Sequence, residues 1–323
     1  MTTTTPSFPE TPRPKVSVCV VTYNQENTIE KCLLSIIEQA CFFDIEIIVG
    51  DDCSTDRTSV IIGEINSRYP SIVKHIRHAV NIGAFANYRF VHKMATGDYV
   101  AHCDGDDWML PGKLAKQNNF LDNNVDCSMV AHRMNLHKDD RFIGATVEAP
   151  RKFDLNYLVL NHPCFLNSSI MYRRLLGAHL FFGEQDFIDF YVYVGLGASG
   201  LIGFVNESLG VYSVGSGISS SRNLMSYVNA AIDLAASYGV NSSDIALARA
   251  KQYFSYSISM AVRNDKLEFM KNIEIAKKWG ANSDKILLIY RLRNCDGVIF
   301  PLIRAYLYLS LVKKKFRDKH VYQ

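Results

Sequence analysis

The chain has little charge imbalance and no long apolar run, and both absences exclude classes of function. Its formal net charge is +3 over 323 residues, too small to indicate a nucleic-acid partner. No stretch reaches the roughly 18 uninterrupted apolar residues that a membrane-spanning helix requires. No internal repeat is present either.

Cysteine and histidine patterns of the usual binding sites are also missing. The eight cysteines form no Cys-x-x-Cys pair, and the nine histidines show no metal-site spacing. We therefore expect reduced, mostly buried thiols and a cytosolic compartment.

The chain does contain enough apolar material for a core. Hydrophobic residues make up 48% and charged residues 21%, which is ordinary for a globular protein. The length suits one large domain or two modest ones. Residues 1–14 are rich in Thr and Pro, so we expect a disordered lead-in that is neither a signal peptide nor a membrane span.

Strands and helices alternate along the first hundred residues. Short β-branched runs predict strands over 16–21, 45–49, 73–77 and 98–103. Apolar residues at helical spacing predict a helix after each of the first three strands, and Asn27 with Glu30 suggests a capping box for the first. The pattern predicts an α/β fold with a mostly parallel central sheet covered by helices.

The run His102 to Trp108 places three carboxylates within four residues, directly after the fourth predicted strand. Like charges this close repel one another unless a cation neutralises them. Oxygen ligands at this density suit Mg²⁺ or Mn²⁺, although an acidic surface turn is the alternative.

Polar residues follow the other strands at the same place. Tyr23 and Asn24 end the first strand, and Asp51 and Asp52 end the second. Because ligands of parallel sheets bind beyond the carboxyl ends of the strands, we expect these side chains to share one crevice with the acidic run.

Four segments in this order resemble the family 2 glycosyltransferases, which are inverting enzymes with the GT-A fold. The segments are 16–26, 47–58, 81–83 and 97–108. The resemblance covers roughly 15–220 and implies a nucleotide-sugar-binding catalytic domain over 15–221. Few Gly or Pro residues interrupt the remainder, 222–323, which we expect to be helical, with helices over 243–264 and 266–279.

The resemblance also implies roles by position. Asp51 would hydrogen-bond the base of the donor and Asp52 would support it. Asp104, the first acid of the DxD motif, would lie toward the ribose, and Asp106 would hold a divalent metal, Mn²⁺ or Mg²⁺, on the diphosphate. The remaining residues implied at the nucleotide are Thr22, Tyr23, Asn24, Glu26 and Asn81.

An inverting transfer needs one carboxylate as general base. The candidates are Glu184, Asp186 and Asp189. Many relatives carry an Asp-Trp at a similar spacing before a Tyr-Arg-x-His segment, and measured back from Tyr212 this resemblance implies Asp189. One departure from the family follows Tyr212, where relatives often show Tyr-Arg-x-His but this chain has Ser213-Val214-Gly215. Arg222, or the hydroxyls of Ser216 and Ser219, could bind the diphosphate instead.

Several other residues have bland interpretations. We expect Asp107 to be a helix cap or a solvated turn residue, Trp108 to pack, and His102 to be a satisfied core residue. Residues 162–164 and 168–174 match a family segment on the acceptor side, with strand and loop packing as the alternative.

The leading interpretation is an inverting glycosyltransferase that uses a UDP- or dTDP-sugar. Its acceptor would be a hydroxyl of a glycan or lipid-linked oligosaccharide in cell-surface polysaccharide synthesis. The alternatives are a non-catalytic nucleotide-sugar-binding relative and a nucleotidyltransferase, although the glycine-rich phosphate loop of the latter is missing after the first strand.

The apolar and aromatic segment 298–312, with the basic residues after it, defines a last candidate region, Val298–Arg317. It is interpreted either as a helix docked on the catalytic domain or as an interfacial helix that meets anionic lipid. The second interpretation would make a cytoplasmic protein peripheral to the inner face of the membrane. The sequence does not specify the oligomeric state.

Overall fold

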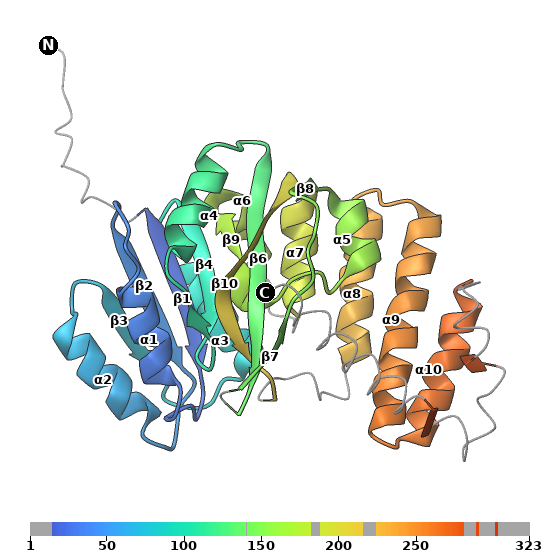
Figure 1. The fold of residues 1–323 in the computed structure, drawn as a ribbon, viewed down its shortest axis with the longest axis horizontal. Coiled ribbons are helices and arrows are strands. Elements are labelled where there is room, and N and C mark those ends of the chain that lie inside the picture. The colour runs from blue at the N-terminus through green and yellow to red at the C-terminus, as the bar shows by residue number, and fades with distance from the viewer. Residues whose placement is uncertain are drawn as a thin grey trace, which may run out of the picture.

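The computed structural model describes residues 15–139, 141–181, 188–215, 224–280, 289–290 and 301–302. Within them lies one ten-stranded sheet whose main path runs β3-β2-β1-β4-β9-β6-β10-β5, with β7 on β6 and β8 on β10. Figure 1 shows this sheet beside a row of C-terminal helices.

The four predicted N-terminal strands are confirmed and pair in parallel. They are β1 (Val16–Thr22), β2 (Ile45–Asp51), β3 (Val73–Arg77) and β4 (Tyr99–Asp104). The three predicted helices between them are present as α1 (Ile29–Ile37), α2 (Thr58–Arg68) and α3 (Ala84–Met94). The buried, β-branched strands need apolar cover on both faces, and these helices supply part of it.

The predicted capping box of α1 is wrong. The N-cap is Thr28, one residue after Asn27, and no side chain caps the helix. The Thr28 hydroxyl instead donates to the Gly105 carbonyl at 3.0 Å. A contact between distant segments has replaced the local cap, and it ties the start of α1 to the acidic run.

The second half of the sheet is mixed in direction. Strand β10 runs parallel to β6, whereas β9, β5, β7 and β8 pair antiparallel. The elements are β5 (Trp108–Met109), α4 (Lys113–Asp122), β6 (Cys127–Lys138), β7 (Arg141–Ala145), β8 (Lys152–Phe153), α5 (Leu155–Asn161), η1 (Asn167–Ser169), β9 (Met171–Arg173), α6 (Arg174–Gly177), η2 (Ala178–Phe181), α7 (Asp189–Ala198) and β10 (Leu201–Ser213).

Strand β10 is a single long strand that joins two apolar runs, 201–205 and 209–212. Its register against β6 shifts on both sides of Ser208. This irregularity corresponds to the polar interruption that divides the hydrophobic pattern, because a bulge lets a strand continue through residues that do not pair regularly.

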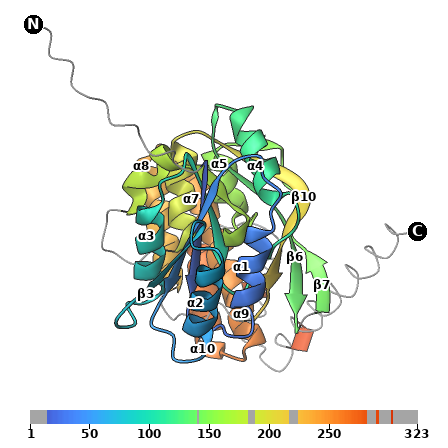
Figure 2. The ribbon, with the colours of Figure 1, turned by 90° about the vertical axis from the view of Figure 1, so that its left-hand side faces the viewer.

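Two hydrophobic clusters cover the two faces of the sheet. One combines strand residues with apolar side chains of α1, α2 and α4, and the other with those of α3, α5, α7 and α8. Figure 2 shows α1 and α3 on opposite sides of the strands. The result is a three-layer sandwich that leaves the ends of the strands as the place for polar side chains.

The C-terminal helices are α8 (Leu224–Ser237), α9 (Ser242–Val262) and α10 (Lys266–Lys278), which confirms the two predicted helices. Val228 and Ile232 of α8 and Ile245 of α9 belong to the same cluster as α7. The helices therefore extend the core of the sheet, and a division near residue 221 remains an interpretation.

None of the helices in the described part is long and apolar enough to cross a membrane. Residues 1–14 and, apart from 301–302, the segment Val298–Arg317 lie outside the described residues, so the lead-in and the lipid-facing helix stay predictions.

Candidate functional site

The carboxyl ends of three parallel strands meet at one edge of the sheet. Thr22 at the end of β1 pairs with Asp51 of β2, and its neighbour Val21 pairs with Asp104 of β4. The strand ends that the sequence predicted to converge therefore do so. Tyr23, 47% exposed, follows directly at this edge, while Thr22 is buried and donates from its hydroxyl to Gln25 Oε1 at 2.7 Å.

Asn24 and Glu26 connect the loops that follow β1 and β2. Asn24 adopts a left-handed φ of 52°, and its Oδ1 accepts from the Thr55 amide at 2.8 Å. Glu26 Oε2 accepts from the Arg57 amide at 2.9 Å. These side chains fix the shape of the predicted nucleoside pocket.

Asp51 is fully buried at the end of β2 and carries one carboxylate oxygen without a hydrogen bond. Its Oδ1 accepts from the Ser54 amide at 2.9 Å, while Oδ2 lies 3.8 Å from His75 Nε2 and 3.7 Å from Arg77 Nε. Burial alone would raise the pKa of Asp51, but interactions with His75, Ser54 and Ser59 lower it to about 2. Asp51 is therefore an ionised, buried carboxylate with one oxygen that makes no hydrogen bond.

Both side-chain oxygens of Asp52 accept hydrogen bonds from the protein. Its two carboxylate oxygens accept from the amides of Ile82 (2.7 Å) and Gly83 (3.0 Å), and Asn81 Nδ2 donates to the Asp52 carbonyl at 3.1 Å. Asp52 and Asn81 therefore shape the turn before α3, and the role of Asp52 in supporting Asp51 at the donor base stays a prediction.

The acidic motif turns sharply at the end of β4. The amide of Gly105 donates to the Val21 carbonyl at 2.9 Å, and a β-carbon at Gly105 would clash with Gln25 and come within 2.9 Å of Thr22 Cβ. Only glycine lets the loop lie this close to β1. The turn leaves Asp104 and Asp106 partly exposed on either side of Gly105.

Asp107 differs from its prediction, because it is neither a helix cap nor solvated. It is 1% exposed, and the residue that caps α4 is Gly112. Its Oδ1 accepts from the Ser213 amide at 2.9 Å, whereas Oδ2 has no hydrogen-bond partner. Burial, and then the charges of Asp104 and Asp106, raise the pKa of Asp107 well above its ordinary range.

Ser213, where relatives often carry an arginine, ties β10 to the acidic motif. Besides its amide bond to Asp107, its hydroxyl donates to the Asp106 carbonyl at 2.6 Å. Tyr212 lies among the acids. Burial raises its pKa to about 12, and the next contributions to this rise are the charges of Asp107, Asp104, Asp106 and Asp189. The four carboxylates therefore surround one region of the molecule.

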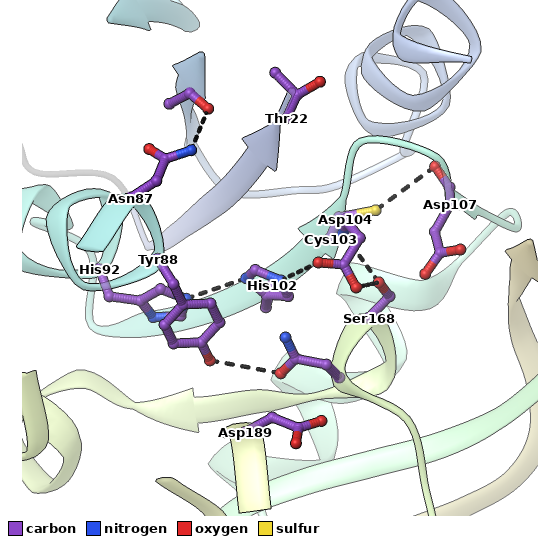
Figure 3. A network of polar contacts seen from close by, with 12 residues as sticks. Thr22, Asn87, Tyr88, His92, His102, Cys103, Asp104, Asp107, Ser168 and Asp189 are labelled. Atoms are coloured by element: carbon purple, nitrogen blue, oxygen red, sulfur yellow. Dashed lines mark hydrogen bonds and ion pairs between the residues drawn. The ribbon is translucent and has the colours of Figure 1, made fainter. Parts of the chain in front are cut away.

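Asp189 is the first residue of α7 and lies on the side of the site that faces η1. Its Oδ1 accepts from the Phe190 amide at 2.8 Å, and the Tyr193 hydroxyl lies 3.0 Å from Oδ2. Burial raises the pKa of Asp189, and the charge of Asp104 adds to the rise. Figure 3 shows it near the network around Asp104. The other candidates, Glu184, Asp186, Arg222, Ser216 and Ser219, lie outside the described residues.

Asp104 and Asp106 suit a divalent cation whose remaining coordination positions are filled by a bound ligand. In the described part of the chain, no group of three or more acid, histidine or cysteine side chains forms a metal-binding cluster. However, Mg²⁺ and Mn²⁺ at phosphates usually take only one or two carboxylates. The charges of Asp104 and Asp106 both raise the pKa of the buried Asp107 beside them, and a cation at this turn would balance those two charges.

Sequence reasoning missed the residues that hold these acids. Ser168 Oγ accepts from the Asp104 amide at 2.9 Å and lies 3.4 Å from Asp104 Oδ2. Lys113, fully buried, donates to the Ser168 carbonyl at 2.7 Å, and burial lowers its pKa to about 8. No local pattern signals these contacts, because they join segments that are distant in the chain.

The contact between His102 and Asp104 could have been predicted from the sequence. Residues two apart on a strand point to the same face, so His102 on β4 had to lie beside Asp104. The structure confirms the predicted burial of His102 and adds a contact of 3.0 Å between its Nε2 and Asp104 Oδ1.

A helix-covered sheet with polar side chains and the acids Asp104 and Asp106 at its strand ends agrees with the GT-A class of fold. Residues 17–177 match the family model "Glycosyl transferase family 2". The chain belongs to glycosyltransferase family 2.

Relatives and solved structures agree with this assignment. An uncharacterized protein of Mycobacterium tuberculosis is 33% identical over 200 residues, 61% of this chain and 58% of that protein, so the chain spans less than two thirds of this relative. The structure of S. aureus TarS 1–349 in complex with UDP-GlcNAc superposes with a TM-score of 0.62 at 17% identity, over 91% of this chain and 92% of that one. The mannosyltransferase PcManGT of Pyrobaculum calidifontis, in complex with GDP-Man and Mn²⁺, gives 0.56 at 17% identity, over 97% and 89%.

Proposed function

We propose that this chain transfers a sugar, with inversion, from a nucleotide-sugar donor to a hydroxyl of a glycan or lipid-linked oligosaccharide. The observation that carries the proposal is the arrangement of the acids. Asp104 and Asp106 follow β4 at the ligand-binding edge of the sheet, and Asp189 is close enough for the charge of Asp104 to raise its pKa. Membership in family 2 supports the same activity.

The nucleoside side of the donor would bind at the ends of β1 and β2. The unpaired Oδ2 of Asp51 is a buried, ionised acceptor for an N–H group of the base. Tyr23 offers an exposed ring beside it. A UDP- or dTDP-sugar is the proposed donor, and uracil and thymine each present a ring N–H that cytosine lacks. The complex of TarS with UDP-GlcNAc is compatible with this choice.

The diphosphate would lie at the acidic motif. Asp106 would hold Mn²⁺ or Mg²⁺ there, with Asp104 toward the ribose. A cation at this place neutralises the charge that grows on the departing nucleoside diphosphate. The Mn²⁺ complex of the mannosyltransferase supports a metal in this fold.

Asp189 would accept the proton of the attacking hydroxyl. A general base works best when its pKa lies near the operating pH, and burial moves the pKa of Asp189 in that direction. The amide of Phe190 fixes one of its oxygens, and the Tyr193 hydroxyl contacts the other. A single displacement requires no enzyme nucleophile, so one correctly placed base is sufficient.

The test combines binding with turnover. Thermal unfolding is followed with UDP-, dTDP-, GDP- and CMP-sugars, with and without Mn²⁺, because a ligand of the folded state raises Tm. Nucleotide release is then measured with the donor that binds. We expect a metal-dependent shift with a UDP- or dTDP-sugar, and a loss of release by about 10²-fold or more in Asp106→Asn.

Glu64→Gln is the matched control, because Glu64 is an exposed acid of α2 away from the strand ends. It should leave both readouts unchanged. Binding without release in the presence of a panel of glycan acceptors would indicate a non-catalytic relative. A flat thermal response to every donor would argue against the whole proposal.

A further inference from the structure

A continuous chain of hydrogen bonds runs from the interior of the protein to Asp104. The Tyr172 hydroxyl lies 2.7 Å from His92 Nδ1, His92 Nε2 lies 3.1 Å from His102 Nδ1, and His102 Nε2 lies 3.0 Å from Asp104 Oδ1. Figure 3 shows the two imidazoles in line with the carboxylate. The chain joins three elements, β9, α3 and β4.

The interior part of this chain is closed to water and held by aromatic packing. Tyr172, His92 and His102 are 1%, 4% and 0% exposed, whereas the Asp104 side chain is 33% exposed. Tyr88 stacks on His92 with ring centroids 4.1 Å apart, and Phe181 stacks on it at 4.9 Å. The rings therefore have little freedom to change their partners.

When Asp104 is a carboxylate, the hydrogen bonds of the chain all point in one direction, from Tyr172 toward Asp104. A carboxylate accepts, so His102 donates from Nε2, and in a ring with a single proton Nδ1 is then an acceptor. His92 must then donate from Nε2 and accept on Nδ1, and Tyr172 must donate. Burial keeps the pKa of His92 well below its ordinary range, which agrees with a neutral ring.

We propose that His102 is a positioning residue for Asp104, and that the ordered chain Tyr172–His92–His102 fixes the orientation in which Asp104 meets the ribose of the donor. The inference rests on the proposed function for its ligand. His102 holds Oδ1, and Ser168 lies 3.4 Å from Oδ2, so both carboxylate oxygens have a partner from the protein.

Repulsion explains why such support is required. The charges of Asp104 and Asp106 lie within one tight turn, and both raise the pKa of the buried Asp107 beside them. A carboxylate with like charges on one side turns away from them unless a donor holds it. The hydrogen bond from His102 supplies this restraint from the buried side and leaves the exposed side for the donor. An aligned hydrogen-bond chain also strengthens its terminal bond.

The first test reads the protons directly and needs no activity. In protein labelled with ¹⁵N-histidine, we expect His92 and His102 each to carry a proton on Nε2 and to have a bare Nδ1. Their signals are assigned with the His92→Gln and His102→Gln variants. A proton on Nδ1 of either ring would overturn the ordered chain.

The second test measures the affinity for UDP with Mg²⁺ by calorimetry. Gln can place its amide near the position of His102 Nε2, whereas Leu fills the space without a donor. We expect His102→Leu to lose roughly 10-fold or more in affinity and His102→Gln to stay within about 3-fold of wild type. Equal affinities of wild type and His102→Leu, with both folded, would overturn the positioning role.

Tyr172→Phe tests the chain at its far end, which touches neither Asp104 nor a ligand. Its control is Tyr99→Phe, since the Tyr99 hydroxyl also bonds a partner, Asp122, and lies at the opposite end of β4. Both variants should lower Tm, but only Tyr172→Phe should weaken UDP binding. Equal weakening by both would reduce the effect to general destabilisation and overturn the inference.

The two proposals fail in different ways. If the wild-type protein binds none of UDP, dTDP and GDP, the proposed function fails. The positions of the histidine protons still show whether the hydrogen-bond chain is ordered. If wild type binds UDP but the His102 variants bind equally well, the inference alone fails.

Discussion

Asn167 and Ser168 are neighbours in η1, and each faces a different carboxylate of the candidate site. Ser168 Oγ holds the Asp104 amide at 2.9 Å. Asn167 Oδ1 lies 3.1 Å from the Tyr193 hydroxyl, which contacts Asp189. A single short turn thereby links the proposed donor-side acid to the proposed base, so its position sets how far apart the two can lie.

Two side chains of α4 hold η1 in place. Lys113 donates to the Ser168 carbonyl at 2.7 Å, and Gln117 donates to the Ser169 carbonyl at 2.8 Å. Both donors come from α4 and are fully buried. The rigidity of η1 therefore comes from the helix that follows the acidic motif.

Replacing the proposed base should separate catalysis from donor binding. In Asp189→Asn we expect kcat to fall by about 10²- to 10⁴-fold, because proton removal is lost, while KM for the donor changes little. Steady-state kinetics with a working acceptor provide the measurement. A variant with near-normal kcat would shift the role to Glu184 or Asp186.

The pH dependence of the same residue has a defined sign. Burial raises the pKa of Asp189, so the base is protonated, and the rate falls, at a pH above the ordinary range of an aspartate. A group with a raised folded pKa favours folding as the pH falls through that pKa, so its ionisation costs stability at neutral pH. Asp189→Asn should thus be at least as stable as wild type at pH 7 in urea unfolding, although it is much slower. A clear loss of stability would contradict the raised pKa.

Asp51 should show the opposite dependence. Its pKa of about 2 lies below the ordinary 3.8, so its ionised form contributes stability above pH 4 that is lost as the pH falls toward 2. The contribution is on the order of 2 kcal/mol. Urea unfolding of wild type and Asp51→Asn should differ by this amount at pH 7 and converge only as the pH falls to about 2 and below. The control is Asp44→Asn, an exposed acid just before the other end of β2, and a difference that stays constant with pH would contradict the assignment.

Gly105 should tolerate no side chain. A β-carbon there would meet Gln25 and Thr22, so Gly105→Ala must displace the acidic loop and cost about 1–3 kcal/mol. Gly63→Ala in α2 is the control, because nothing lies within 4 Å of its added methyl group and alanine favours a helix. Chemical unfolding should show a loss for the first variant and a neutral or stabilising effect for the second. Equal stability of both would show that the loop is not packed against β1.

The regular alternation of strands and helices made the first half of the fold predictable from the sequence. The strands β1 to β4 are β-branched, buried runs separated by helices of ordinary length, so local preference and tertiary packing agree. Prediction was poorer after Trp108, where β9 and β5 pair antiparallel and η1 is only three residues long. Such short elements carry too few residues for a periodic signal and depend on their neighbours.

The sequence by itself determined the α/β class, the family, and the convergence of Thr22, Asp51 and Asp104, because parallel strands of matched register must end at one edge. Tertiary structure alone decided which acids are solvated and which are held. Asp107 is buried although Asp104, three residues before it, is partly exposed, since the turn at Gly105 directs them to different surroundings. Asp104 and Asp107 are held by Ser168 and Ser213, which lie 64 and 106 residues further along the chain, and no local pattern encodes such contacts.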